Sequence, residues 1–188
     1  LSRTGAGLGA FEAGHHRAHA LAALAEHGAT LRLPFVALTW DGSGYGDDGA
    51  AWGAECLVLD ERGHARRQGS FVPCALIGGD EAVRDPRRVA HALRYAAGCP
   101  RRDDAEHAAW TRMLEQRVNT PFASSIGRLF DGVATLVDEH AVRYARPTFE
   151  GQCALRFEAL ARGVAGDVHP YATAGTVDED GVNGMGWR

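Results

Sequence analysis

Residues 40–49, with the sequence Trp-Asp-Gly-Ser-Gly-Tyr-Gly-Asp-Asp-Gly, constrain the fold of this chain more than any other segment. They follow residues 31–40, an apolar run whose β-branched and aromatic members predict a strand. Residues 51–59 form a second apolar run and predict another strand. Because the glycines between these runs disfavour any regular helix, the segment predicts a tight acidic turn that follows the first strand.

The flanking segments place this turn between a helix and a hairpin. Residues 13–27 are rich in Ala, Leu, Glu and His and predict a helix that ends at Gly28. The turn at residues 60–63 predicts a hairpin between strands 51–59 and 65–76. Further helices are expected from about residue 86 to 97, from 103 or 104 to 118, from 124 or 125 to 138, and from 150 to 162. The chain is therefore expected to be α/β, with a mixed sheet and hairpin followed by a helical block.

Composition narrows the functional classes. The chain has 188 residues and a net charge of −4, which fits about one domain with no general attraction to nucleic acid or anionic lipid. All 20 basic residues are arginine, which excludes a Walker lysine and a lysine Schiff base. The four cysteines form no CxxC pair, which favours free thiols in a reducing cytoplasm. We therefore expect a cytoplasmic location, with no membrane or nucleic acid as partner.

The chain opens on Leu1 and stops at Arg188, so we expect a piece of a longer protein in which residues 1–188 belong to one catalytic domain. Residues 173–188 are polar and rich in glycine, and we expect them to be a loop-like, truncated end.

Two histidines four residues apart, His15 and His19, are candidate metal ligands. On a helix their side chains share one face, which is the geometry of HxxxH metal sites. The alternative is a solvated helix start that is rich in histidine. Spacing alone does not decide between the two.

The glycine-rich segment itself can be interpreted in two ways. Backbone N–H groups of Gly42, Ser43, Gly44 and Gly46 could approach phosphate oxygens, and Asp41, Asp47 and Asp48 could hold a cation. The alternative is a plain turn between two strands.

The third candidate segment is residues 124–131, Ser-Ser-Ile-Gly-Arg-Leu-Phe-Asp. Either serine can cap the helix that follows, and the free N–H groups there could bind an anion. Asp131 lies two turns further along, near the apolar face, where a carboxylate needs a partner or a ligand hydroxyl.

Taken together and in this order, the motifs resemble the carboxy-terminal carbamoyltransferase domain of the hydrogenase maturation protein family HypF. The resemblance covers roughly residues 13–165. The segments that carry it are 15–19, 35–49, 52–55, 78–80, 84–86, 119–121, 124–131 and 150–152.

The resemblance implies a partial actin-like ATPase fold and a defined reaction. In the family, carbamoyl phosphate and ATP give carbamoyl-adenylate, and this domain passes the carbamoyl group to a carboxy-terminal cysteine of the partner HypE. By the resemblance, His15, His19 and Asp41 would hold a transition metal, iron or zinc, and Asp41 would serve catalysis. Gly42, Ser43, Gly44 and Gly46 would lie at the phosphates, and Asp131 and Gly151 would face the ribose of the nucleotide.

The chain departs from the family pattern in ways that bear on activity. Arg17 replaces a usual histidine, and Gly14 replaces a usual glutamine. The amino-terminal domains of the family and its closing segment, with a further Asp ligand, are not in this sequence. We therefore expect the isolated chain to be inactive and marginally stable, with helix faces at 86–97 and 124–138 exposed. The alternatives are an O-carbamoyltransferase of natural-product biosynthesis and a non-catalytic, partner-binding remnant.

Overall fold

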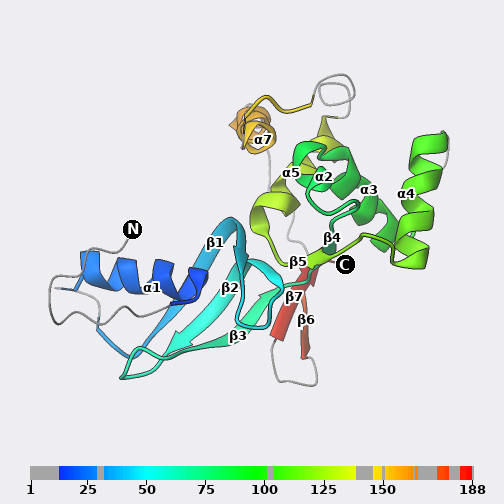
Figure 1. Cartoon of the computed structure of the whole chain (residues 1–188). Helices are drawn as coiled ribbons and strands as arrows, with labels where there is room; N and C mark the ends of the chain where they lie inside the picture. Colours follow the sequence, from blue (N-terminus) through cyan, green and yellow to red (C-terminus); the bar gives the residue numbers. More distant parts are fainter. Residues whose placement is uncertain are drawn as a thin grey trace, which may run out of the picture.

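The computed structural model describes residues 13–28, 32–100, 104–138, 146–149, 151–162, 164, 173–177 and 183–187. The helices are α1 (His15–Glu26), α2 (Glu81–Arg84), α3 (Arg87–Ala96), α4 (Ala105–Gln116), α5 (Ile126–Val137) and α7 (Gln152–Arg162). The strands are β1 (Phe35–Tyr45), β2 (Ala51–Leu59), β3 (Ala65–Phe71), β4 (Cys74–Ala75), β5 (Phe122–Ala123), β6 (Thr173–Val177) and β7 (Asn183–Trp187). Figure 1 shows α1 beside the β1–β3 strands, with the helical block at the other end of the sheet.

The strands form one mixed sheet in the order β4-β5-β2-β3-β7-β6, with β1 paired to β2. The pairs β1–β2 and β2–β3 are antiparallel, whereas β2–β5 and β3–β7 are parallel. A mixed sheet with a hairpin and a following helical block is the predicted α/β class.

The expected loop-like end at residues 173–188 is wrong where the structure describes it. Residues 173–177 and 183–187 are strands, with β7 paired to β3 and β6 paired to β7. Backbone hydrogen bonding to the edge of β3 makes up for a low strand propensity, because any residue can contribute its N–H and C=O groups to a ladder.

Strand β1 begins and ends later than the predicted strand 31–40. It runs through Asp41–Gly44 to Tyr45, and the turn proper begins only at Gly46, whose N–H donates to the carbonyl of Ala50 at 2.9 Å. The register shifts between Trp40 and Gly44, so Asp41, Gly42 and Ser43 form a bulge opposite Gly53 of β2. The predicted turn is therefore divided into a bulge and a short hairpin turn.

Helix α1 covers one face of the hairpin sheet. Ala20 of α1 packs with Trp52, Leu57 and Leu59 of β2, and Phe35 and Ala37 of β1 join this cluster. On β1 the alternate residues Val36, Leu38 and Trp40 are exposed. The side chains of β1 thus alternate between a face packed under α1 and an open face.

The helical block buries more than the sequence suggested. Val89, Ala90 and Ala92 of α3 are buried, and α3 packs against α5, where Gly132 lies against Val89 and Leu93. The expectation of an exposed apolar face at 86–97 is therefore wrong. In 124–138, Phe130 and Val137 are exposed, while Ile126 and Ala134 are buried.

Two helices, α4 and α5, begin at predicted caps, whereas α1 has its C-cap at His27, one residue before the predicted Gly28. Asp104 accepts the N–H of His107 at 2.8 Å at the start of α4, and Ser125 accepts the N–H of Arg128 at 3.1 Å at the start of α5. Within the described ranges, every helix is too short or too polar to cross a membrane.

Candidate functional site

Three predicted ligands converge at the junction of α1 and β1. His15 Nε2 lies 2.5 Å from Asp41 Oδ2, His19 Nε2 lies 3.2 Å from His15 Nε2, and His19 Nε2 lies 3.8 Å from Asp41 Oδ2. Among the described residues these three form the group of metal-binding side chains, with their ligand atoms within 4.8 Å of one another. We refer to His15, His19 and Asp41 as the His/Asp group.

Local structure explains why these side chains meet. His15 and His19 are one helical turn apart on α1, so both rings project from the same face. Asp41 reaches them because it lies in the β1 bulge, which bends the strand away from its ladder. Two elements joined by the eight residues 27–34 thus bring two imidazoles and one carboxylate together.

The donor set fits a transition metal after a small adjustment. Tetrahedral ligands about 2.0 Å from zinc are about 3.3 Å apart, and the two His19 distances of 3.2 and 3.8 Å are close to that value. The shorter contact of 2.5 Å between His15 and Asp41 is a hydrogen bond. A metal would have to displace that proton and separate the two atoms by roughly 1 Å.

The electrostatics favour an ionised Asp41. Partial burial alone would raise its pKa, but hydrogen bonds from His15 and from the N–H of Gly42 bring the pKa below its usual value. Beside the group, burial lowers the pKa of His16 more than the Coulombic attraction of Glu55 raises it. Asp41 is therefore a carboxylate at neutral pH, and His16 is a neutral imidazole.

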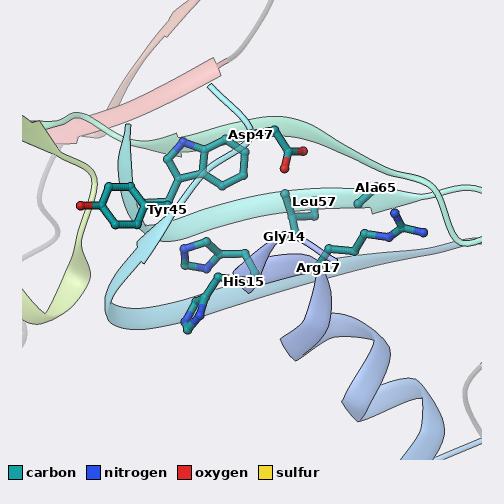
Figure 2. Close-up of a pocket in the computed structure, with 9 residues that line it drawn as sticks. Gly14, His15, Arg17, Tyr45, Asp47, Leu57 and Ala65 are labelled. Carbon is teal, nitrogen blue, oxygen red and sulfur yellow. The ribbon is translucent and has the colours of Figure 1, made fainter. Parts of the chain in front are cut away.

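A small, shallow pocket adjoins the His/Asp group. Figure 2 shows Asp47 at the top of the view and His15 and Arg17 of α1 below, with Leu57 and Ala65 of the strands between them. The departures from the family pattern lie here. Arg17 lines the pocket, and a Cβ at Gly14 would come within 2.8 Å of Asp47 Oδ1. Asp47 thus occupies space beside Gly14 that a larger residue would need.

The remaining loop residues differ in what they offer a ligand. The N–H of Gly42 donates to Asp41 Oδ1 at 2.6 Å, and that of Gly46 donates to Ala50, so both have partners within the chain. Ser43 is exposed. Asp48 accepts hydrogen bonds from the N–H of Ala50 at 2.9 Å and the indole of Trp52 at 3.1 Å. Asp48 therefore stabilises the turn and stands outside the His/Asp group.

The two residues expected at a ribose lie elsewhere, on the α5–α7 side. Asp131 is buried and its carboxylate is 2.9 Å from the guanidinium of Arg128. Gly151, with φ of +79°, precedes α7, which packs on α5 through Phe130 and Phe157. Asp131 lies six positions after Ser125, which corresponds to about 9 Å along the helix. Glu150 lies outside the described residues.

Sequence reasoning missed a buried polar network behind the His/Asp group. The carboxylate of Glu55 is fully buried and accepts the N–H of Gly53 at 2.7 Å, the guanidinium of Arg67 at 3.2 Å and the hydroxyl of Ser124. His16 Nδ1 lies 3.9 Å from the other side of this carboxylate. The signal was present in the sequence, because one carboxylate inside the apolar run 51–59 must find partners when the strand is buried.

Comparison with known proteins identifies the class of this domain as a Kae1-like carbamoyltransferase domain. Residues 37–183 match the family described as "Carbamoyltransferase, Kae1-like Domain, second subdomain". The chain is 41% identical over 163 residues to Carbamoyltransferase HypF2 of Cupriavidus necator. The solved structure of full-length HypF in its phosphate- and nucleotide-bound form superposes with a TM-score of 0.75 at 29% identity, over 93% of this chain and 22% of that one. The chain belongs to the HypF carbamoyltransferase family, and the predicted α/β, partial actin-like fold is confirmed as part of a Kae1-like domain.

The match covers a limited part of the relatives. The aligned segment is 82% of this chain but 19% of HypF2. A second Cupriavidus necator relative, Carbamoyltransferase HypF homolog, is 39% identical over 89% of this chain and 44% of its own length. The chain thus spans about a fifth of the first relative and less than half of the second.

Proposed function

We propose that this chain forms the metal-holding part of a carbamoyltransferase site in hydrogenase maturation. The donor is carbamoyl-adenylate and the acceptor is the carboxy-terminal cysteine of a HypE-like protein. The observation that supports this proposal is the convergence of His15, His19 and Asp41 in a family-like fold. The HypF names of the relatives favour this reaction over O-carbamoylation of a small natural product.

In the proposed reaction, the cysteine sulfur forms a bond to the carbamoyl carbon and the bond from that carbon to the phosphate oxygen breaks. AMP leaves, and the thiol proton is released. A bound iron or zinc ion would supply Lewis-acid polarisation at this centre. His15, His19 and Asp41 would hold the ion, and the ionised state of Asp41 suits it for that role.

The nucleotide would extend from the β1 bulge towards α5 and α7. Gly42, Gly44 and Gly46 would shape the loop beside the phosphates, with the exposed Ser43 available for direct contact. Asp131 and Gly151 would face the ribose. For this, Asp131 would have to share its carboxylate between the guanidinium of Arg128 and a ribose hydroxyl.

A chimera tests the proposal. This chain replaces the matched segment of HypF2, and the product receives ATP, carbamoyl phosphate and a HypE protein. We expect the mass of the HypE carboxy-terminal peptide to increase by one carbamoyl group. The same chimera with His15→Ala and His19→Ala should keep its circular dichroism spectrum and lose the transfer. A folded chimera without transfer, or transfer that survives both substitutions, would contradict the assignment.

A further inference from the structure

The amino-terminal end of α5 contacts the β1 bulge through Ser125. The Ser125 hydroxyl donates to the carbonyl of Gly42 at 2.6 Å and lies 3.4 Å from the carbonyl of Asp41. The same oxygen accepts the N–H of Arg128, which is the capping bond of α5. Capping needs only the acceptor, so the donated bond to Gly42 ties the helix to the strand segment that carries Asp41.

The preceding residue, Ser124, contacts the other half of the site through Glu55. Its buried hydroxyl donates to Glu55 Oε1, and Arg67 donates to both Glu55 and Ser124, at 3.2 and 3.3 Å. Glu55 Oε2 lies 3.9 Å from Nδ1 of His16, which is the neighbour of His15 on α1. Among the described residues, neither ring nitrogen of His16 has a hydrogen-bond partner, so Glu55 acts on the ring through its charge across 3.9 Å.

Glycines bring the three elements close together. A Cβ at Gly44 would lie 2.3 Å from Cδ2 of His15 and 2.8 Å from Nε2 of His16. A Cβ at Gly127 would lie 2.9 Å from Cα of Gly42. Since the bulge lies between α1 and α5 in direct contact with both, a shift of α5 must move one part of the His/Asp group relative to another.

We propose that Ser124 and Ser125 are positioning residues of the His/Asp group. Ser125 sets the place of Asp41 through the Gly42 carbonyl, and Ser124 sets the orientation of α1 through Glu55 and His16. The two serines thereby fix the separation between the histidines and the carboxylate. This inference depends on the proposed function, in which that group holds a metal.

Zinc binding to the 188-residue chain tests the inference, with Zn(II) alone as the probe. Ser125→Gly keeps most of the capping free energy, because glycine costs only a few tenths of a kcal/mol at this position, but it removes the donated bond. We expect Ser125→Gly to weaken zinc binding about 10- to 100-fold, the range found for groups that orient metal ligands. Ser125→Thr keeps the hydroxyl and should restore wild-type affinity. Ser124→Ala should weaken zinc binding by a smaller factor, because it acts through two intermediates.

The control is Thr135→Ala on the same helix. It removes a buried hydroxyl bond to the carbonyl of Asp131 at 2.7 Å, away from the His/Asp group. Its thermal midpoint without metal should fall while its zinc affinity stays at the wild-type value. If wild-type chain binds zinc and Ser125→Gly and Ser124→Ala bind it equally well, the inference is overturned. If the wild-type chain itself binds no zinc, it is the proposed metal site that fails.

Discussion

At the α1–β1 junction, the side chains of His15 and His19 are about half exposed, and their Nε2 atoms converge with one carboxylate. Between α3 and α4, His91 is buried and its Nε2 lies 2.9 Å from the hydroxyl of Thr111. There, His107 contacts Asp104, the cap of its own helix, at 2.8 Å. Both regions contain two histidines and an aspartate, but only the first directs its polar atoms to one shared point.

The difference lies in how the nitrogen atoms are satisfied. The Thr111 hydroxyl donates to the carbonyl of His107 at 3.0 Å, so its oxygen accepts from His91, which assigns the proton of His91 to Nε2. These bonds join α3 to α4 and serve the core. Histidine content alone therefore does not indicate a metal site. Exposure and convergence distinguish the His/Asp group from the histidines of the core.

The largest expected effect is on metal affinity. His15→Ala and His19→Ala should each weaken zinc binding to the chain by at least about 100-fold, beyond the range for groups that only orient ligands. His107→Ala, in the region between α3 and α4, should leave zinc affinity unchanged. Isothermal titration with Zn(II) provides the comparison, and equal losses in all three variants would remove the distinction between the two regions.

The second effect is on the stability of the protein, through the contact of His91 with Thr111 between α3 and α4. Thr111→Val keeps the side-chain shape but takes away the partner of His91 Nε2, so the free energy of unfolding should fall by about 1–3 kcal/mol. Urea denaturation measures this change. Zinc affinity should not move, and a parallel loss of zinc binding would connect the core histidines to the site.

The third effect is on transfer. Asp41→Asn in the HypF2 chimera should keep the fold and slow carbamoyl transfer at least about tenfold, which is about 1.4 kcal/mol of barrier. The amide keeps the size of the side chain but removes the charge that attracts a metal. The rate of transfer is measured as carbamoylation of the HypE carboxy-terminal peptide. Full activity of the Asp41→Asn variant would show that the bulge has a purely structural role.

The smallest effect is on the pH dependence of stability without metal. Burial lowers the pKa of His16. Its contribution to the free energy of unfolding is therefore fully present above the pKa of the unfolded state, about 6.5, and is lost as the pH falls through the pKa of the folded state. The lowered pKa of Asp41 acts in the same direction at more acidic pH, below about 3.9. His16→Gln should flatten the loss of stability as the pH falls below about 6.5. Denaturation in the presence of a chelator would measure it, and identical slopes would exclude His16 as the cause.

Much of the architecture could be predicted because local signals determined it. Helices α4 and α5 begin at capping side chains, Asp104 and Ser125, and β2 has the predicted bounds. The pairing of His15 with His19 followed from helical periodicity. These features depend on residues near one another in the sequence, where spacing is informative.

The rest depended on contacts between distant segments. Strand β1 continues through glycines because β2 pairs with it on both sides of the bulge, and β7 is a strand because β3 offers an edge. Glu55 and Ser124 meet across 69 positions of sequence. No local pattern predicts such a partnership, although a lone carboxylate in an apolar strand shows that one is required.

The bulge has a further consequence for how such a site can arise. Three residues of β1, Asp41 to Ser43, stand opposite the single Gly53 of β2, so the strand carries an excess of two. Side chains in a strand alternate with a period of two, and an even excess therefore leaves both flanking stretches in phase. Phe35 and Ala37 still face the core, as they would in an uninterrupted hairpin. The bulge can therefore gain or lose residues in pairs without moving the core-facing side chains of β1 to the solvent face. The residues of the bulge, and their chemistry, can then vary while the sheet stays the same.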